Sequence, residues 1–211
     1  MKIVSLIPAR GGSKGISNKN IIDINGKPLI YYTIKASLNS ENISETWVST
    51  DCSEITRISN HYGARVIQRP QELADDIIMP DPSLVHFANN IDFDVLVFIQ
   101  PTSPLLESKY INEGVRLLNE YDSVFSAYKE HWLPRWGCDN KPYMWDIYNR
   151  PRRQDAKELY VENGAFYITK KDYLLNSRLR YSGNIGMVEM PFEKSFQVDS
   201  LDDLKLVRSL I

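Results

Sequence analysis

The 211-residue sequence predicts an α/β protein built on a mostly parallel β-sheet with helices on both faces. Short apolar runs typical of buried strands alternate with longer stretches of helical pattern, and this alternation is typical of parallel sheets. The expected strands cover residues 2–7, 45–49, 64–68, 95–100, 123–128 and 165–169, and the expected helices cover 28–37, 54–62, 82–90 and 109–120. Because ligands bind at the carboxyl ends of the strands in such sheets, we expect a site at that edge.

Composition and charge narrow the classes of function. Hydrophobic residues make up 43% of the chain and charged residues 25%, which is ordinary for a globular protein. The net charge of −2 argues against a protein that binds nucleic acid through bulk positive charge. Cys52 and Cys138 form neither a disulfide framework nor a zinc motif, which favours a reducing compartment. No signal-peptide pattern and no run of transmembrane length is present, so a cytoplasmic location without membrane contact is expected.

A glycine-rich loop with several cations follows the first expected strand. Three glycines between positions 11 and 15 let the backbone turn sharply and approach a ligand closely. Arg10, Lys14 and Lys19 bring positive charge to this turn, and such a loop is suited to phosphate. The spacing matches neither the GxxxxGK[ST] loop nor the GxGxxG dinucleotide motif. The alternative is a solvated basic loop.

Further polar segments are expected at the same edge. Residues 50–51 and the turn 100–104 follow apolar strands, and Gln100 offers both a donor and acceptors there. An ordinary strand-end turn is the alternative for this segment. Residues 162–167 are expected to be a turn entering a strand, and Asn163 would then face the crevice.

Asp199 is a candidate magnesium ligand. Residues 198–203 are expected to end a strand and open the last helix. Hard carboxylate oxygens suit Mg²⁺ beside phosphates, and Asp199 would stand at the strand end. Asp202 and Asp203 are better explained as acids that complement the first turn of a helix.

The alternation of strands and helices breaks between residues 129 and 162, where Trp, Tyr, Pro and Arg are frequent. We expect this segment to leave the sheet as a lid or an oligomerisation arm, because exposed aromatic residues with arginine are typical of interfaces. The alternative is that the aromatics cap the sheet edge. Arg150, Arg152 and Arg153 surround one proline and form a candidate site for carboxylate or phosphate, with a solvated charged loop as the alternative.

Taken in order, these motifs resemble the CMP-sialic acid synthetases, or acylneuraminate cytidylyltransferases. The matching segments cover nearly the whole chain: residues 9–15 with 19–20, 47–51, 69–76, 100–104, 122–126, 150–155, 162–167 and the segment ending at Asp199. The resemblance implies one Rossmann-like nucleotidyltransferase domain over residues 1–211, with residues 129–162 as a small protruding dimerisation arm. It also implies a homodimer that transfers CMP from CTP to the anomeric hydroxyl of an acidic nine-carbon sugar, with Mg²⁺ as cofactor.

The resemblance assigns roles to individual residues. The catalytic residues would be Arg10, Lys19, Arg152 and Arg153. The nucleotide-binding residues would be Arg10, Gly12, Ser13, Lys14, Lys19, Asn20 and Arg69. The sugar-binding residues would be Gln100, Arg135, Arg153 and Asn163, and Asp199 would hold the metal.

Two departures from the family pattern keep other functions open. Gln197 stands where the family's metal motif usually has a first aspartate, and residues 77–80 are Ile-Ile-Met-Pro where relatives often carry hydroxyl residues that contact the nucleotide. One alternative is a related enzyme that uses another nucleotide or a hexosamine phosphate. The other is a non-catalytic protein that binds nucleotides. No residue stands out as a general base, and both Asp199 and a metal-bound hydroxide stay open for this role.

Overall fold

The computed structural model describes residues 1–12, 15–73, 79–131, 134–155 and 157–211. Within these ranges a seven-stranded sheet has the order β11-β7-β10-β6-β1-β4-β5. Its strands are β1 (Ile3–Pro8), β4 (Glu45–Thr50), β5 (Arg65–Gln68), β6 (Val95–Ile99), β7 (Ser123–Lys129), β10 (Tyr160–Lys170) and β11 (Ile185–Glu189). β10 is antiparallel to both of its neighbours, and the other pairings in the sheet are parallel. The predicted mostly parallel sheet is therefore confirmed.

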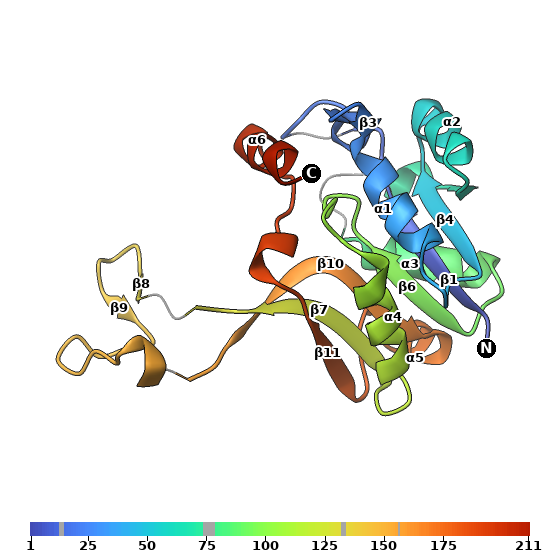
Figure 1. Cartoon of the computed structure of the whole chain (residues 1–211). Helices are drawn as coiled ribbons and strands as arrows, with labels where there is room; N and C mark the ends of the chain where they lie inside the picture. The colour runs from blue at the N-terminus through green and yellow to red at the C-terminus, as the bar shows by residue number, and fades with distance from the viewer. Residues whose placement is uncertain (13–14, 74–78, 132–133, 156) are drawn as a thin grey trace.

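Helices cover both faces of this sheet (Figure 1). One face is covered by α1 (Leu29–Leu38), α2 (Ser53–His61) and α4 (Ser108–Leu117), and the other by α3 (Asp81–Asn90) and α5 (Lys171–Ser177). The last helix, α6 (Leu201–Leu210), packs in a smaller third cluster of apolar residues. The predicted arrangement of helices on both faces is confirmed.

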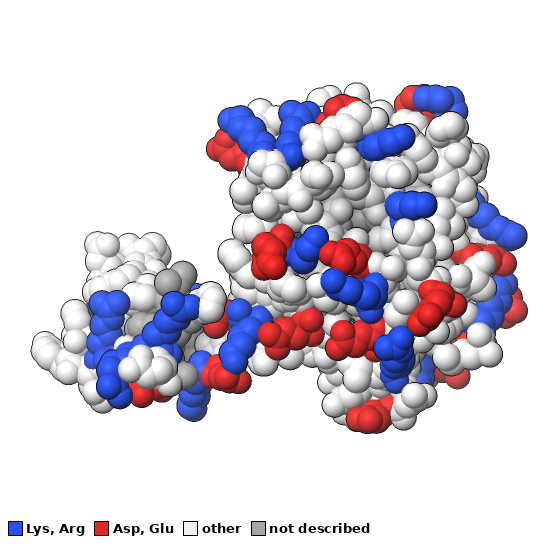
Figure 2. All heavy atoms as spheres, viewed as in Figure 1, with Lys and Arg blue, Asp and Glu red and all other residues white. Residues whose placement is uncertain are grey.

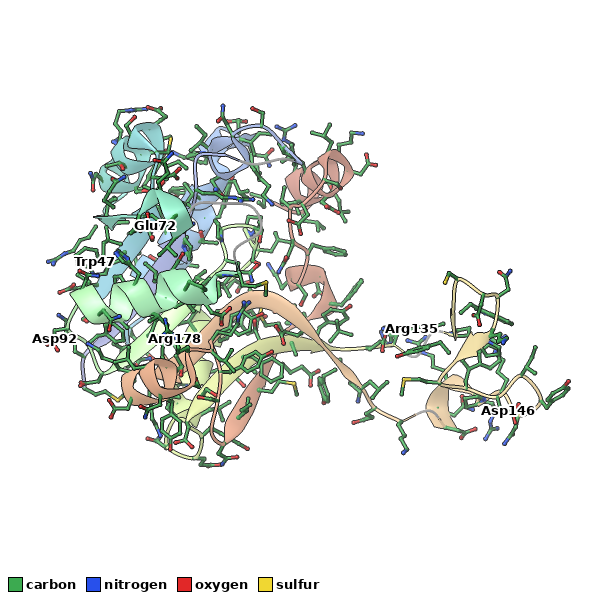
Figure 3. The ribbon with its side chains drawn as sticks, turned by 180° about the vertical axis from the view of Figure 1, so that it is seen from behind. Trp47, Glu72, Asp92, Arg135, Asp146 and Arg178 are labelled. Atoms are coloured by element: carbon green, nitrogen blue, oxygen red, sulfur yellow. The ribbon has the colours of Figure 1, made fainter. Side chains whose placement is uncertain are left out.

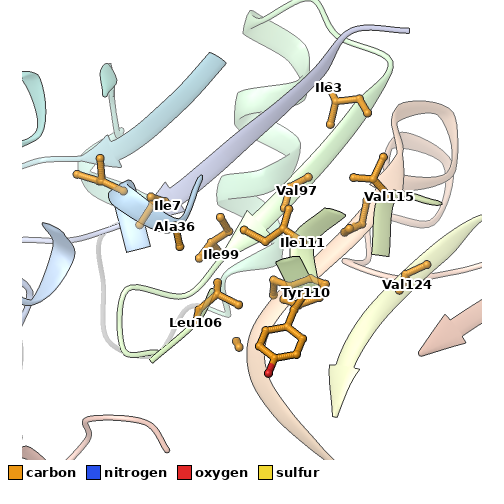
Figure 4. Packing of buried hydrophobic residues seen from close by; sticks show 14 of the residues in the cluster. Ile3, Ile7, Ala36, Val97, Ile99, Leu106, Tyr110, Ile111, Val115 and Val124 are labelled. Carbon is orange, nitrogen blue, oxygen red and sulfur yellow. The ribbon is translucent and has the colours of Figure 1, made fainter. Parts of the chain in front are cut away.

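The alternation of side chains along the central strand explains how both faces become buried. In β1, Ile3 and Ile7 join the cluster under α1, α2 and α4, whereas Val4 and Leu6 join the cluster under α3 and α5. Figure 4 shows the first of these clusters, with Ile111 of α4 among the strand side chains. A strand that is apolar on both faces is held rigidly, so the loop at its end has a fixed starting point.

The chain between β1 and α1 turns tightly. It contains a 3₁₀-helix, η1 (Lys19–Ile21), and a small hairpin of β2 (Asp23–Ile24) and β3 (Lys27–Pro28). Asn25 and Gly26 form the hairpin turn, and both have positive φ, as a two-residue turn of this kind requires.

Several elements differ from the sequence predictions. The strand expected at 165–169 begins at Tyr160, and β11 and α5 form where we predicted no regular element. The prediction that Val198 ends a strand is wrong. Its amide donates to the Thr102 carbonyl at 2.8 Å, in a loop that leads from η4 (Phe192–Lys194) to α6. One such bond does not make a ladder, because a strand needs repeated pairing with a neighbour.

The described residues between β7 and β10 (130–131, 134–155 and 157–159) form an arm that projects from the body of the molecule (Figures 1 and 3), whereas residues 129 and 160–162 of the predicted arm belong to those two strands. The arm contains β8 (Arg135–Trp136), β9 (Pro142–Tyr143) and the 3₁₀-helix η3 (Arg153–Asp155). The Trp136 and Trp145 rings pack edge to face at 5.2 Å, so these aromatics lie on the arm and do not cap the sheet edge. Figure 2 shows several Lys and Arg side chains gathered on the arm. Among the described residues, no helix is long and apolar enough to cross a membrane.

Candidate active site

A cleft of about 330 Å³ lies where β1, β5 and β6 end at the same edge of the sheet. Its lining includes the predicted residues Arg10, Lys19, Asn20, Arg69, Gln100 and Asp199. Arg10 follows β1, Arg69 follows β5, and Gln100 follows β6, as expected for carboxyl ends of parallel strands. Lys19 and Asn20 belong to η1, and Asp199 comes from the segment before α6. The structure thus brings together six predicted residues that are far apart in the sequence.

Neighbouring strand ends brace the glycine loop. The Gly11 amide donates to Asp51 Oδ1 at 2.9 Å, and Asn20 Nδ2 donates to the Arg10 carbonyl at 3.0 Å. A Cβ on Gly11 would lie 2.9 Å from Cys52 Cβ, so the close approach of the loop to α2 requires glycine. Gly12 has open space around it. The predicted nucleotide ligands Ser13 and Lys14, and residues 77 and 78 of the departing segment, lie outside the described residues.

Arg69 is a buried cation in the wall of the cleft, with 7% of its surface exposed. Its Nε donates to Ser49 Oγ at 3.2 Å and its Nη2 to the Ser49 carbonyl at 3.0 Å. The pKa of Arg69 is lowered to about 10, chiefly by burial; nearby Asp51 opposes this shift and nearby Arg10 adds to it. A charge held in so poor a solvent favours an anionic ligand, because the ligand would restore part of the lost solvation.

Lys19 and Asp199 form an ion pair across the cleft. Lys19 Nζ lies 2.8 Å from Asp199 Oδ1, and the two residues are 180 positions apart. The Lys19 side chain is 18% exposed and that of Asp199 is 65% exposed. The residue we predicted to hold phosphate and the residue we predicted to hold metal therefore neutralise each other here.

The neighbouring Asp203 has a different role. Its carboxylate accepts from the Ser200 amide at 2.7 Å, and Ser200 caps α6 in return. Hydrogen bonds from the Ser200 hydroxyl and from the backbone amides of Ser200 and Asp199 hold the pKa of Asp203 below its usual range. Its prediction as a first-turn acid is confirmed.

A second hollow of about 510 Å³ adjoins the first and shares Gln100, Gln197 and Asp199 with it. Asn163, a predicted sugar ligand, lines this hollow, but its side chain is engaged in bracing β10. Its Oδ1 accepts from Ser126 Oγ at 2.6 Å and from the Ala165 amide at 3.1 Å, and its Nδ2 donates to Ser195 Oγ at 2.9 Å. Its role as a sugar ligand stays a prediction.

The brace is needed because β10 contains a bulge. The pairing of β10 with β7 shifts register between Glu162 and Tyr167, and Gly164 has a φ of +69°. The shift leaves backbone amides without ladder partners, and Ser126 Oγ accepts from one of them, that of Phe166, at 3.0 Å. Gln197 Nε2 donates to the Asn163 carbonyl. The residue that replaces the family's first metal aspartate therefore supports the bulge.

The structure does not bring the predicted arm residues into the cleft of their own chain. Arg135, labelled in Figure 3, lies on the arm and pairs with Glu130. Arg152 Nε donates to Asp155 Oδ2 at 2.5 Å, so the expected excess of positive charge in this cluster is partly neutralised. Arg153 contacts His131 Nδ1.

Sequence reasoning missed some residues of the cleft wall, among them Phe98 and Ser83. It also gave no role to the hydroxyl of Thr102, which lines the cleft, is buried and has no hydrogen-bond partner among the described residues. The sequence feature that could have pointed to Thr102 is its position in the turn 100–104, but a hydroxyl in a turn is usually explained by local hydrogen bonds.

The described residues contain no group of three or more His, Cys, Asp or Glu side chains that could hold a metal ion by themselves. Asp199 is one exposed carboxylate beside the cations of the cleft. This donor set fits a divalent cation that takes most of its ligands from phosphate oxygens and water, as Mg²⁺ does in nucleotide sites.

The fold and the cleft define an α/β protein of the nucleotidyltransferase type. The structure is similar to that of CMP:2-keto-3-deoxy-manno-octonic acid synthetase complexed with CTP, with a TM-score of 0.77 over 100% of this chain and 98% of that chain. Sequence identity to it is 20%, so the likeness shows the shared fold. A model of the cytidylyltransferase family matches residues 4–204, and the chain belongs to this family.

Named relatives are similar over almost all of the chain. N-acylneuraminate cytidylyltransferase A from Danio rerio is 38% identical over 93% of this chain and 48% of the relative. The N-acylneuraminate cytidylyltransferase of Escherichia coli O18:K1:H7 is 33% identical over 97% of this chain and 51% of its own length. Pseudaminic acid cytidylyltransferase from Campylobacter jejuni is 30% identical over 100% and 96%. The chain thus spans about half the length of the first two relatives and nearly all of the third.

Gly164→Ala tests whether the bulge in β10 requires glycine. We expect a loss of about 1–3 kcal/mol of unfolding free energy, because the positive φ strains any L side chain and the new Cβ would collide with the Gln197 amide. Urea unfolding followed by circular dichroism measures this loss. Gly12→Ala, with no atom near its Cβ, is the stability control. An unchanged midpoint for Gly164→Ala would show that the bulge does not depend on glycine.

Proposed function

We propose that the chain is a cytidylyltransferase that activates a nonulosonic, sialic-acid-like sugar, forming a CMP-sugar and pyrophosphate from CTP. The observation that carries the proposal is the cleft, where cations from three separate segments, Arg10, Lys19 and Arg69, converge beside the polar amide of Gln100. Membership of the cytidylyltransferase family and the names of its relatives support the nucleotide and the sugar class. Free Cys52 and Cys138 support a reducing, cytoplasmic location.

The proposed reaction needs orientation and charge neutralisation. The anomeric oxygen of the sugar attacks the α-phosphorus in line, the bond to the β-phosphate oxygen breaks, and the hydroxyl proton leaves to solvent. Arg10 and Lys19 would neutralise the growing charge on the phosphates, and Gln100 would orient the sugar from the boundary between the two hollows. Loss of one well-placed donor of this kind costs about 3–4 kcal/mol of transition-state stabilisation.

We propose Mg²⁺ as the cofactor, with Asp199 as its ligand from the protein. When bound with the nucleotide, Mg²⁺ would neutralise phosphate charge. To bind the metal through Oδ1, Asp199 would have to release Lys19 Nζ, which lies 2.8 Å from that oxygen. We therefore expect the ion pair to open when ligands bind, with Lys19 moving to a phosphate and Asp199 to the metal.

We further propose a homodimer in which the arm of one chain completes the cleft of the other. In a single chain the arm projects from the body of the molecule (Figure 1) and carries Arg152 and Arg153 with it, and no described residue of the arm lines the cleft. Its surface exposes Tyr143, Met144 and Tyr148, and exposed aromatic and Met side chains are typical of protein interfaces. An arm of this composition is better explained by a partner chain than by contact with water alone.

Pyrophosphate release tests the proposed function. With CTP, Mg²⁺ and a panel of neuraminic, legionaminic and pseudaminic acids, we expect release with at least one sugar. A parallel panel pairs GTP, UTP and CTP with hexosamine 1-phosphates. Release only in the second panel would overturn the proposal in favour of a related enzyme, and CTP binding without any release would favour a non-catalytic nucleotide-binding protein.

Asp199→Asn tests the exchange of partners. In EDTA we expect this variant to bind CTP about two- to fivefold more tightly than the wild type, because Lys19 no longer pairs with a carboxylate. Mg²⁺ should raise the affinity of the wild type for CTP, and it should raise the affinity of Asp199→Asn by a smaller factor. Calorimetry measures both constants. Asp202→Asn is the matched control, since Asp202 is an exposed acid that pairs with Lys205. Equal behaviour of the two variants would contradict the exchange.

Mixed dimers test the arm. Arg153→Ala and Arg10→Ala should each be inactive alone, and Arg153→Ala should still bind CTP. Mixing them after unfolding and refolding should restore about a quarter of wild-type activity, because half of the dimers would be mixed and each of these would hold one intact site. No recovery, with a dimer seen by light scattering, would show that Arg153 does not act in the partner's cleft.

A further inference from the structure

A buried ion pair lies outside the residues considered so far. Arg180, in the loop after α5, donates through its backbone amide to Asp81 Oδ1 at 2.8 Å and through Nε to the same oxygen at 3.2 Å. Its Nη2 contacts the other carboxylate oxygen. The side chains of Arg180 and Asp81 are only 13% and 12% exposed. Such a pair requires good geometry, because burial removes both charges from water.

Asp81 belongs to a wall of the cleft. It is the first residue of α3, and Met79, Pro80 and Ser83 beside it all line the cleft. The Ser83 amide donates to the Pro80 carbonyl at 2.9 Å, so these residues form one tight turn. A carboxylate fixed at Asp81 therefore fixes the position of this wall.

Arg180 ties the same wall to the sheet. Its guanidinium lies 5.7 Å from the centre of the Phe98 ring and 5.1 Å from that of Tyr167, and these two rings stack at 5.4 Å. Phe98 lines the cleft. The Tyr167 hydroxyl donates to Glu162, which lines the second hollow, and burial raises the pKa of Tyr167 so that it keeps its proton. One guanidinium thus connects the α3 wall with strands β6 and β10.

The far end of α3 is held by separate contacts. Lys171 Nζ donates to the Ile91 carbonyl at 3.0 Å, and the Lys171 amide donates to the Asp94 carbonyl at 2.9 Å. Leu84 and Phe87 anchor the helix in the core. Loss of Arg180 should therefore release the first turn of α3 while the rest of the helix stays in place.

We propose that Arg180 is a positioning residue for the nucleotide: through Asp81 it holds the first turn of α3 as a wall of the CTP cleft. The inference rests on the proposed function, since it takes CTP as the occupant of this cleft. The printed contacts of Arg180 include none of the described residues of the predicted phosphate grip, so its effect should fall on nucleotide affinity and spare the chemical step.

The test compares Arg180→Gln, Asp81→Asn and the double variant with the wild type. We expect Arg180→Gln to weaken CTP binding roughly tenfold or more by calorimetry, and to raise the KM for CTP equally, because displacement of a wall residue disturbs ligand placement. We expect kcat at saturating CTP and the KM for the sugar to change by less than about threefold. The double variant should bind CTP no worse than Arg180→Gln, because both changes break the same contact.

The controls separate positioning from general destabilisation. Arg57→Gln removes an exposed arginine that pairs with Glu54, and it should leave CTP binding unchanged. Thermal unfolding monitors each variant, and Arg180→Lys, which keeps one buried charge, replaces Arg180→Gln if the latter does not fold. Lysine should recover only part of the CTP affinity, since it lacks the two-pronged contact.

Two outcomes overturn the inference alone. One is a folded Arg180→Gln variant that binds CTP as the wild type does, and the other is an equal fall in kcat and in affinity for both substrates. Failure of the proposed function appears instead in the wild-type protein: a lack of pyrophosphate release overturns the proposed function alone, and a lack of CTP binding overturns both.

Discussion

The pairing of β10 with β6 is the constraint on which the two hollows depend. Within the described part of the chain, β10 is the one strand of the main sheet that runs antiparallel to its neighbours, and its Phe166 and Tyr167 lie opposite Ile99 and Phe98. The backbone amide of Gln100 donates to the Ala165 carbonyl at 3.1 Å. The pairing of the two strands therefore also fixes Gln100, which lines both hollows. On the N-terminal side of Gly164, the same strand leads back into the arm. One strand therefore sets the cleft, the bulge beside it and the direction of the arm.

Several charged groups in and beside the cleft have partners within the protein. Lys19 pairs with Asp199, Asp51 accepts from the Gly11 amide, and Arg69 is held by Ser49 with a depressed pKa. Each of these contacts keeps a group that suits phosphate or metal in place without a ligand present. The cost of burying Arg69 is met by the fold, and a bound anion would recover part of it. Such preorganisation favours ligands of defined charge and size over small ions in solution.

Much of the fold could be predicted because the main strands are apolar on both faces and the helices between them have clear periodicity. The glycine loop, residues 50–51 and Gln100 could be placed at one edge because the carboxyl ends of parallel strands meet there, whereas Arg69 was assigned only by the family resemblance. β11 and α5 were missed because they are short, and their stability comes from contacts with β7 and β10. The part played by Gln197 could not be predicted, because its partner is a backbone carbonyl exposed by a bulge in another strand.

The sequence by itself determined the alternating fold and the family resemblance, and it predicted a phosphate-binding first loop, because these depend on local pattern and on motif order. Only the tertiary structure decided that Lys19 pairs with Asp199, that Asn163 braces a bulge, and that Arg180 is joined to Asp81. These partners are up to 180 positions apart, and no local pattern in the chain records which of them meet. Long-range pairing is set by how the strands pack, and the chemistry of the cleft follows from that packing.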